Sequence, residues 1–476
     1  MKKSIITGLA LALASIPVMA QQEASRSGYF LDGYTHRHEL NPALGGEYNY
    51  VSIPILGNFN VGVNSNVGVN TFLYKLPNGQ LTTFMNPNVD GQEFVSKLAG
   101  NNKVIPNFNL SLVSLGFKAL GGFNTLSISA RVDGGVNVPK GLLEFMKMGQ
   151  QGESSTYSFE NMRVNLNASA EIALGHSHKI NDKIDVGAKV KVLLGMGNLD
   201  ARIQKMNMTL SDTQWKITGQ GNVNVALGSG LYLPTYQEAG REYDNPSQAD
   251  QISWDDMDYN SFSIAGGGAA LDLGVVYRGL VPGLTLSASI LDLGFMTWNN
   301  VKKGETPYTE WTFDGFKDIA FDEDSPNYEE NKLDEQISRL GDDLEDCFNF
   351  RRVEDNGSRA TMLATTIHIA GEYEMPFYKN LTAGLLLTQR INGAFSWTEG
   401  RISANCKPTK WFDVSANYAI STFGSSFGWM INFHPKGFNF FIGSDHQFFN
   451  LTPQIVPVGH ANANVTFGFN VTFGKS

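Results

Sequence analysis

The chain alternates apolar and polar residues along many of its segments. Between Met162 and Leu174 the even positions are Met, Val, Leu, Ala or Ile, whereas most odd positions are Arg, Asn, Ser or Glu. Successive side chains of a β-strand point to opposite faces, so this period of two predicts strands with one apolar and one polar face. The same pattern recurs in segments 59–70, 126–133, 184–192, 284–290 and 465–473.

The first residues predict export from the cytoplasm. Two lysines precede the apolar run Ile5–Val18, and a small-residue cleavage pattern ends at Ala20. The run is shorter than the roughly 20 residues that a membrane-spanning helix needs. We therefore predict a signal peptide over residues 1–20 and a mature chain that starts at Gln21.

Long alternating strands in an exported chain predict a transmembrane antiparallel β-barrel in a Gram-negative outer membrane. The predicted strands reach ten residues or more, whereas strands of soluble sheets average about five to six. In such a barrel the apolar face of each strand contacts lipid. A secreted β-sandwich or propeller is the soluble alternative, in which the apolar faces would form a shared core. Export, strand length and period together favour the barrel.

The lengths of the connections predict the orientation of this barrel. The long connections are expected outside the cell and the short turns in the periplasm, as in known outer-membrane barrels. This scheme gives about 14 strands, or 16 if Ala201–Ala226 forms an additional hairpin. It assigns residues 21–48 to an N-terminal periplasmic or plug segment and residues 49–476 to the barrel. The short connections lie near Ala119–Phe123, Lys179–Lys183, Gly279–Gly283, Met375–Asn380 and Cys406–Lys410.

Composition supports a membrane protein and excludes several other classes. Only 17% of the 476 residues are charged, whereas soluble domains have about 25%. The 50 glycines are about half again the share of about 7% that is usual in soluble domains. Two cysteines cannot form a disulfide scaffold. The net charge of −10 argues against a nucleic-acid partner, whose phosphates would be repelled.

The negative charge is concentrated in one predicted external loop, residues 299–358. This loop has 17 acidic and 7 basic residues, which gives it a net charge of −10. Within it Leu333, Ile337 and Leu340 recur at helical spacing, so we predict an amphipathic helix there, as one of several short helices in loops.

Several charged residues fall on the polar faces of predicted strands and should face the lumen of the barrel. Charge is tolerated in a barrel lumen but not on the lipid face. A structural network of ion pairs filling the lumen is favoured over a selectivity filter. These residues are Arg131, Asp133, Arg163, Glu171, Asp185, Lys189 and Lys191.

Two motifs with possible chemistry do not predict a catalytic or metal site. Gly424–Gly428 matches the G-x-S-x-G pattern around Ser426, but it is expected in a loop with no helix after it, as a nucleophile elbow requires. The H-x-H pairs His36/His38 and His176/His178 have no supporting cysteine or carboxylate cluster, so they are interpreted as interfacial or turn histidines. We therefore predict no enzyme activity, no metal and no cofactor.

The segment before the first strand contains Asn41-Pro42-Ala43, which resembles the hallmark of FadL-type outer-membrane barrels, the long-chain fatty-acid transporter family. The strand Gly268–Arg278 looks like a D-L-G-x-x-Y strand of the same superfamily, and the ending Val471–Gly474 is similar too. The whole chain most resembles a FadL-like group of unknown function, related to the PorV-like barrels of a secretion system.

This resemblance implies that the N-terminal segment folds into the lumen as a plug, with Asn41, Pro42 and Ala43 at the junction between plug and wall. An equally weighted alternative is that this segment only seats the first strand. In FadL-type proteins a hydrophobic ligand passes through a lateral opening in the wall.

The leading functional hypothesis is therefore passive uptake of a small hydrophobic molecule across the outer membrane. The alternative is a structural or assembly barrel that holds a secreted protein with its external loops and transports nothing. An outer-membrane phospholipase is disfavoured, because no Ser/His pair is expected on one strand face at the level of the membrane. The expected partners are outer-membrane lipid and either a hydrophobic small molecule or a secreted protein.

Overall fold

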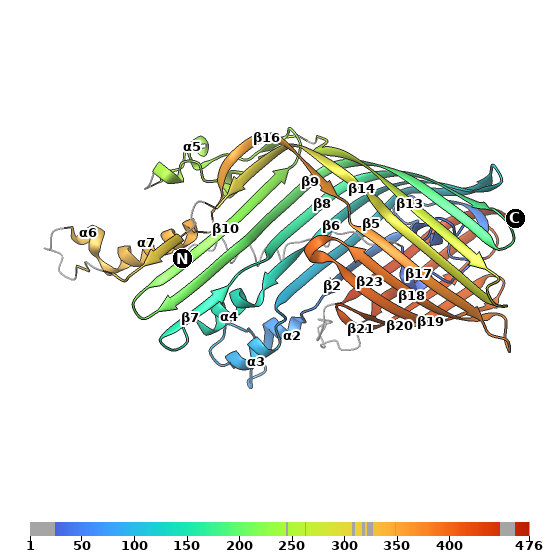
Figure 1. Cartoon of the computed structure of the whole chain (residues 1–476), viewed down its shortest axis with the longest axis horizontal. Helices are drawn as coiled ribbons and strands as arrows, with labels where there is room; N and C mark the ends of the chain where they lie inside the picture. The colour runs from blue at the N-terminus through green and yellow to red at the C-terminus, as the bar shows by residue number, and fades with distance from the viewer. Residues whose placement is uncertain are drawn as a thin grey trace.

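The computed structural model describes residues 24–243, 246–261, 263–306, 310–316, 319–320, 327–347, 349–447 and 462–475. The predicted signal peptide and its cleavage site lie outside these residues. The described chain forms one antiparallel 19-stranded sheet that closes on itself, because the first strand pairs with the last. The predicted all-β antiparallel barrel is thereby confirmed (Figure 1).

The sheet contains strands of very different lengths. Its first half comprises β1 (Tyr48–Ser52), β2 (Phe59–Ser65), β5 (Asn101–Ala119), β6 (Gly122–Pro139), β7 (Ser154–Ser158), β8 (Met162–Lys179), β9 (Ile184–Ser211), β10 (Trp215–Ala226), β13 (Gly266–Arg278) and β14 (Leu284–Glu305). Its second half comprises β15 (Glu310–Phe313), β16 (Arg351–Met362), β17 (Thr365–Glu374), β18 (Leu381–Ile391), β19 (Trp397–Thr409), β20 (Phe412–Ser421), β21 (Gly424–Phe433), β22 (Phe438–Gln447) and β23 (Ala463–Lys475).

The estimate of about 14 strands is too low for this sheet. That estimate omitted a hairpin over Ala201–Ala226, whereas the alternative of 16 strands included it. The hairpin is present, formed by the paired ends of β9 and β10. The number 19 also includes both parts of each interrupted strand as separate strands. For example, β1 and β2 both pair with β5 and with β23, on either side of the irregular segment Ile53–Asn58.

One end of the barrel has short turns between its strands. We call this the short-turn end and the opposite one the long-loop end. A two-residue turn joins β5 to β6 at Leu120 and Gly121, both with positive φ, which matches the twist of the flanking strands. All five predicted short connections join consecutive strands at this end. The last strand, β23, ends there beside the start of β1.

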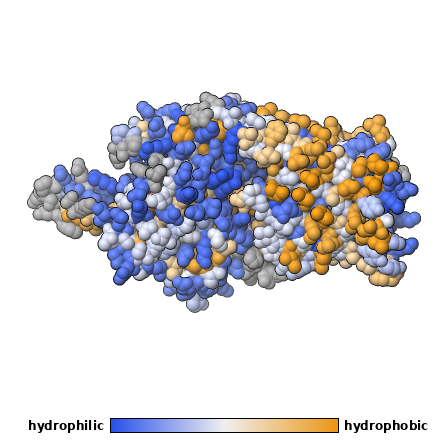
Figure 2. Space-filling view, in the orientation of Figure 1, coloured by the Kyte–Doolittle hydropathy of each residue, from blue (hydrophilic) through white to orange (hydrophobic). Residues whose placement is uncertain are grey.

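The outer face of the barrel carries a band of exposed apolar side chains next to the short-turn end (Figure 2). Members of this band from successive strands are Leu174, Val190, Val275, Ile369, Leu385, Ile402, Ile420 and Phe473. A row of exposed aliphatic and aromatic side chains is the surface that a lipid bilayer covers. Toward the long-loop end the outer surface becomes hydrophilic, although the strands continue.

Helices are short and lie outside the wall or within the lumen. They are η1 (Arg26–Gly28), η2 (Arg37–Glu39), α2 (Val69–Phe72), α3 (Gly91–Ser96), α4 (Lys140–Met148), α5 (Tyr236–Ala239), η3 (Pro246–Gln248), η4 (Trp254–Asp256), α6 (Tyr328–Asn331), α7 (Leu333–Asp346) and η5 (Gly393–Phe395). The predicted amphipathic helix of the acidic loop is α7. Among the described residues no helix combines the length and the apolar character needed to cross a membrane.

Two small sheets accompany the helices at the long-loop end. The hairpin of β3 (Leu73–Lys75) and β4 (Leu81–Thr83) precedes α3, and β11 (Leu231–Tyr232) pairs with β12 (Asp258–Tyr259). The apolar faces of α3 and α4 pack together around Phe94 and Leu143. The loops at this end are therefore folded against the strands they connect.

Candidate functional site

Residues 24–47, which we call the N-terminal segment, lie inside the barrel at the short-turn end (Figure 1). The segment contacts strands around the whole circumference. Its Arg26 pairs with Glu399 on β19, and its Asn41 donates to the Ala288 carbonyl on β14. Most of its side chains are buried, including Tyr29, Tyr34 and Leu40.

The beginning of the segment is held by four buried charges that we call the anchor cluster: Arg26, Glu399, Arg401 and Asp445. Arg26 Nε lies 3.0 Å from Glu399 Oε1, and Arg401 Nη2 lies 2.8 Å from the same oxygen. The Asp445 carboxylate accepts the backbone N–H groups of Arg26 and Ser27 at 3.0 and 2.7 Å. Two positive and two negative side chains balance one another, which makes their complete burial tolerable.

The Asn41-Pro42-Ala43 motif lies against the wall between β9 and β14. The Asn41 amide donates to Ala288 O at 3.2 Å, and its oxygen accepts the Ala43 N–H at 2.9 Å. The backbone comes close to the wall at two glycines. A Cβ on Gly187 would lie 2.2 Å from the Pro42 carbonyl carbon, and one on Gly274 would lie 2.0 Å from Asn41 Oδ1.

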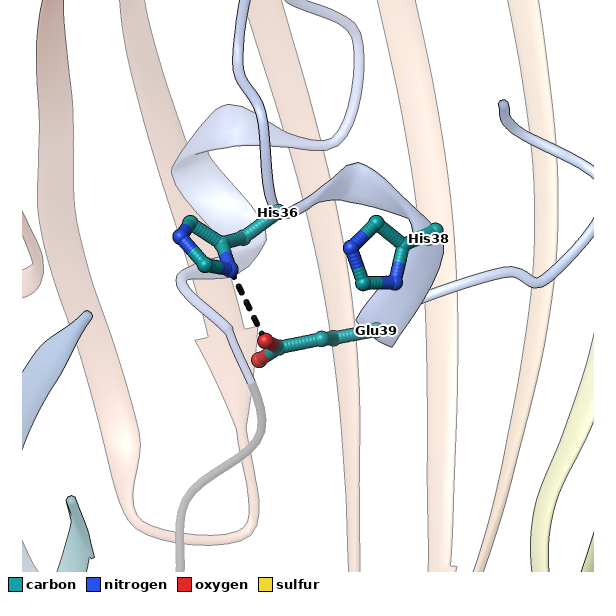
Figure 3. A group of neighbouring side chains, drawn as sticks. All are labelled: His36, His38 and Glu39. Atoms are coloured by element: carbon teal, nitrogen blue, oxygen red, sulfur yellow. Dashed lines mark hydrogen bonds and ion pairs between the residues drawn. The ribbon is translucent and has the colours of Figure 1, made fainter. Parts of the chain in front are cut away.

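His36, His38 and Glu39 form a group that precedes this motif in the chain, with both histidines buried and Glu39 partly buried (Figure 3). Their ligand atoms lie within 4.8 Å of one another. His36 and His38 lie in the interior, so the interfacial part of their interpretation is wrong, whereas His36 does lie in a turn, directly before η2. The carboxylate of Glu39 lies beside them. Burial would raise the pKa of Glu39, but the neighbouring His36 lowers it to about 2. Burial also holds the pKa of His38 well below its ordinary value.

Several of the predicted lumen charges meet in a second group, the wall cluster, on strands β6, β8, β9, β13 and β14. Its members are Arg131, Glu171, Lys191, Asp272 and Asp292. Arg131 Nη2 lies 2.6 Å from Asp292 Oδ2, and Lys191 Nζ lies 2.8 Å from Asp272 Oδ2. Each cation contacts more than one carboxylate, so these side chains fill the lumen as a network.

The other predicted lumen charges lie around this network. Lys189 donates to the His38 carbonyl at 3.3 Å, and Asp133 accepts from Asn167 at 3.0 Å. Arg163 pairs with Asp200 at 2.9 Å. Asp185 lies apart from them, at the short-turn end, where it pairs with Arg278 at 2.7 Å and is partly exposed.

A cavity of about 70 Å³ lies next to the wall cluster, toward the long-loop end. It is bounded by Met362, Leu363 and Ala364, where β16 ends and β17 begins. Its lining is amphipathic. The polar part comprises Arg131, Asp133, Arg163, Asn165, Asn167, Ser169, Asp292, Arg359, Thr361 and Asn392, and the apolar part Leu193, Met296, Trp298, Met362, Leu363 and Ala364.

Ser426 lies at the start of β21 instead of in a loop, and its hydroxyl is 2.8 Å from His446 Nδ1. This contact joins the neighbouring strands β21 and β22 and was not predicted from the sequence. However, Arg26 Nη2 lies 3.0 Å from His446 Nε2, and a guanidinium only donates. With Nε2 accepting, a neutral His446 has its proton on Nδ1, so it donates to Ser426 and cannot take the serine proton as a general base.

Sequence reasoning missed the carboxylates that pair with the predicted cations. Asp272 and Asp292 lie in two copies of Leu-Asp-Leu-Gly, 271–274 and 291–294, in neighbouring strands. An aspartate between two apolar residues in both copies was the available signal. Glu399 and Asp445 gave no comparable signal, because their partner Arg26 is more than 370 residues away.

The fold and interior define a class of protein: a closed antiparallel barrel with an apolar outer band and an N-terminal segment inside. The chain belongs to the Family of unknown function (DUF5723), whose model matches residues 42–445. This membership confirms the predicted group of unknown function. Comparison with curated protein sequences finds no match.

Solved structures similar to this chain include two aromatic-hydrocarbon transporters and a FadL homologue. The toluene transporter TbuX of Ralstonia pickettii has 11% identity and a TM-score of 0.45, over 96% of this chain and 100% of that one. The FadL homologue of Pseudomonas aeruginosa has 11% identity and a TM-score of 0.41, over 96% and 100%. The toluene transporter TodX of Pseudomonas putida has 8% identity and a TM-score of 0.43, over 95% and 99%.

Proposed function

We propose that the protein is a Gram-negative outer-membrane barrel that admits a small amphipathic molecule through the cavity beside the wall cluster. The apolar outer band supports insertion into a bilayer, with the short turns in the periplasm and the long loops outside. The location of the predicted signal sequence at residues 1–20 agrees with export. The proposal involves no catalytic step.

The observation that carries this proposal is the mixed lining of the cavity. Trp298, Met296 and Leu363 provide an apolar side, whereas Arg163 and Arg359 lie on the polar side. Both arginines pair with Asp200. With Arg131, Asp133 and Asp292, which also line the cavity, the polar side has three positive and three negative groups and is close to neutral. Such a lining suits a molecule with a compact apolar body and one polar group that hydrogen-bonds.

Toward the periplasm the N-terminal segment and the two charge clusters fill the lumen. We propose that this segment acts as the plug and Asn41, Pro42 and Ala43 as its junction with the wall. Movement of the segment is then required for passage. The cavity adjoins the wall at Met362–Ala364, which suggests lateral exchange with the bilayer as the alternative exit.

The test uses the purified full-length protein in detergent and in liposomes. Binding of a medium-chain alcohol and of toluene is followed through the fluorescence of Trp298, with Trp298→Phe to identify its contribution. Uptake into liposomes is compared between the wild type and Ala364→Trp, which fills the cavity. Saturable uptake that is lost in Ala364→Trp supports the proposal. Uptake equal to that of empty liposomes contradicts it.

A partner-binding barrel without transport is the second candidate. It is favoured by one observation, the hydrophilic extension of the strands beyond the apolar band. This extension presents β10, β15 and α7 far from the bilayer. Absence of uptake, together with a protein that co-purifies with the wild type but not after replacement of residues 306–350 by a short linker, would favour this function.

A further inference from the structure

His36, His38 and Glu39 come from one short stretch around η2 and are enclosed by the barrel wall. The two imidazole rings lie next to each other, with the Glu39 side chain running beneath them (Figure 3). The ring centroids are 6.0 Å apart, and the ligand atoms of all three residues lie within 4.8 Å of one another. His36 and His38 are 0% and 3% exposed.

The hydrogen bonds of His36 fix its protonation pattern. Its Nε2 faces two acceptors, the Gly57 carbonyl at 3.1 Å and Asn470 Oδ1 at 3.3 Å, so Nε2 carries a hydrogen. The orientation of the Asn470 amide follows from its nitrogen, which donates to Thr35 Oγ1 at 3.2 Å. A neutral His36 therefore presents the lone pair of Nδ1 to Glu39 Oε1, 2.9 Å away. The contact therefore needs a positive centre between the two atoms, which is either a proton on Nδ1, making His36 an imidazolium, or a bound cation.

The two ring nitrogens of His38 have different surroundings. Its Nε2 lies 2.6 Å from the Tyr50 hydroxyl, which also contacts Ser114 Oγ at 2.8 Å. Its Nδ1 is buried and has no hydrogen-bond partner among the described residues. A buried polar atom without a partner is costly, so His38 is not fully satisfied by its present hydrogen bonds.

We propose that His36, His38 and Glu39 bind one divalent transition-metal ion, with Zn²⁺ as the best match. Two imidazoles and one carboxylate are an established donor set for zinc. Ligand atoms at about 2.0–2.1 Å from a tetrahedral zinc are about 3.3 Å apart. The His36–Glu39 contact of 2.9 Å would widen by about 0.4 Å, and the other distances, which lie within 4.8 Å, would close by up to about 1.5 Å. The Tyr50 hydroxyl, 2.6 Å from His38 Nε2, is a further oxygen beside the group.

Groups from the wall orient these ligands, as outer-shell partners do in metal sites. The Gly57 carbonyl holds His36, and the Asn58 amide donates to Glu39 Oε2 at 3.0 Å. Tyr50 on β1 holds His38. The ion would thus fix the N-terminal segment to the irregular first strand. Lys189 is the opposing charge, since its ammonium lies 3.3 Å from the His38 carbonyl.

The experiment measures the zinc content of the full-length protein carrying no histidine tag. The protein is unfolded with a chelator, refolded in detergent with or without Zn²⁺, desalted and analysed for metal. We expect one zinc per chain, and a tetrahedral visible spectrum when Co²⁺ replaces it. Glu39→Gln preserves the shape of the side chain and should weaken binding by more than about 10-fold. Lys189→Met removes the opposing charge and should tighten it.

The matched control is His176→Gln/His178→Gln, which removes the other H-x-H pair. Its ring centroids are 5.9 Å apart, close to the 6.0 Å of the His36/His38 pair, but no third ligand of this kind lies beside them in the described residues. Zinc retained in this control and lost in His36→Gln and Glu39→Gln supports the site. Equal zinc in the wild type and in Glu39→Gln, or no zinc in refolded wild type, overturns it and identifies the positive centre as the proton of an imidazolium.

Discussion

Asp445 is the residue on which the attachment of the N-terminal segment depends most. Besides the N–H groups of Arg26 and Ser27, its carboxylate accepts the hydroxyls of Ser25 and Ser27, each at 2.7 Å. Because all of these groups are buried, no water can replace a lost bond. Within the anchor cluster, four hydrogen bonds to the start of the segment therefore depend on one side chain of a strand near the end of the chain.

We expect Asp445→Ala to lower the free energy of unfolding by about 3–5 kcal/mol, because it leaves Arg26 and Arg401 buried without their full complement of negative charge. Denaturant unfolding in detergent measures this loss. The control is Asp182→Ala, which breaks the pair of Lys179 and Asp182 at an exposed turn and should cost less than about 1 kcal/mol. Similar losses in the two variants would contradict the role of the anchor cluster.

At the junction, Gly274→Ala should displace the Asn41 side chain, since the new methyl group would lie 2.0 Å from its oxygen. We expect a loss of about 1–3 kcal/mol from overpacking and faster tryptic cleavage at Arg37. Gly267→Ala on the same strand is the matched control, because its methyl group meets nothing closer than 3.9 Å. Unchanged cleavage in Gly274→Ala would show that the junction does not hold the segment.

At the scale of the element, alternation predicted the strands because a barrel wall has a different environment on each face. Leu174 and Val190 are exposed on the outer face, whereas Glu171 and Lys191 are buried in the lumen, as their positions in the pattern indicate. The strands were harder to predict toward the long-loop end of the wall. The outer surface there is also polar, so the period of two weakens, and the hairpin of β9 and β10 remained an alternative.

The pairing of charges across the lumen could not be predicted from the sequence. Alternation assigns Arg131 and Lys191 to the interior, but it does not say which carboxylates they meet, since these lie on other strands. The resemblance to FadL-type barrels implied a plug. It did not imply that His36, His38 and Glu39 would be enclosed together, and the search for a supporting carboxylate overlooked the adjacent Glu39.

The packing of the acidic loop around α7 can be measured at the cysteine that follows this helix. Cys347, which follows it, is buried against Ile203, Met206 and Trp311. Burial, followed by the charges of Asp343 and Asp346, raises the pKa of its thiol to about 12.

We therefore expect Cys347 to react with iodoacetamide at pH 8 on the order of 100–1,000-fold more slowly in the folded protein than in the unfolded one, because the thiolate is the reactive form. The rate should still be rising between pH 8 and pH 10, below the raised pKa. Mass spectrometry of alkylated Cys347 in a Cys406→Ser background measures it. Rapid alkylation in the folded protein would show that α7 does not pack on the strands.

At the scale of the whole molecule, the strands are much longer than a bilayer requires. The length of β9, 28 residues, corresponds to about 90 Å at about 3.3 Å per residue. A bilayer needs only about 9–11 residues of each strand. The wall therefore extends well beyond the membrane on one side, which we propose to be the outside of the cell.

Cysteine labelling on intact cells tests this orientation. In a Cys347→Ser/Cys406→Ser background, Glu153→Cys at the long-loop end should react with a membrane-impermeant maleimide. Leu120→Cys, in the exposed turn between β5 and β6, should react only after the outer membrane is permeabilised. The opposite labelling pattern would show that the barrel is inserted the other way round.

The anchor cluster also dictates the order in which this molecule can mature. Ser25 and Asp445 are separated by 420 positions, and β1 closes the barrel against β23. Residues 25–27 therefore have no binding site until the last strands exist, and contacts of such large sequence separation form slowly. A nascent barrel passes through a stage with an unfilled interior, and docking of the N-terminal segment is the step that completes it.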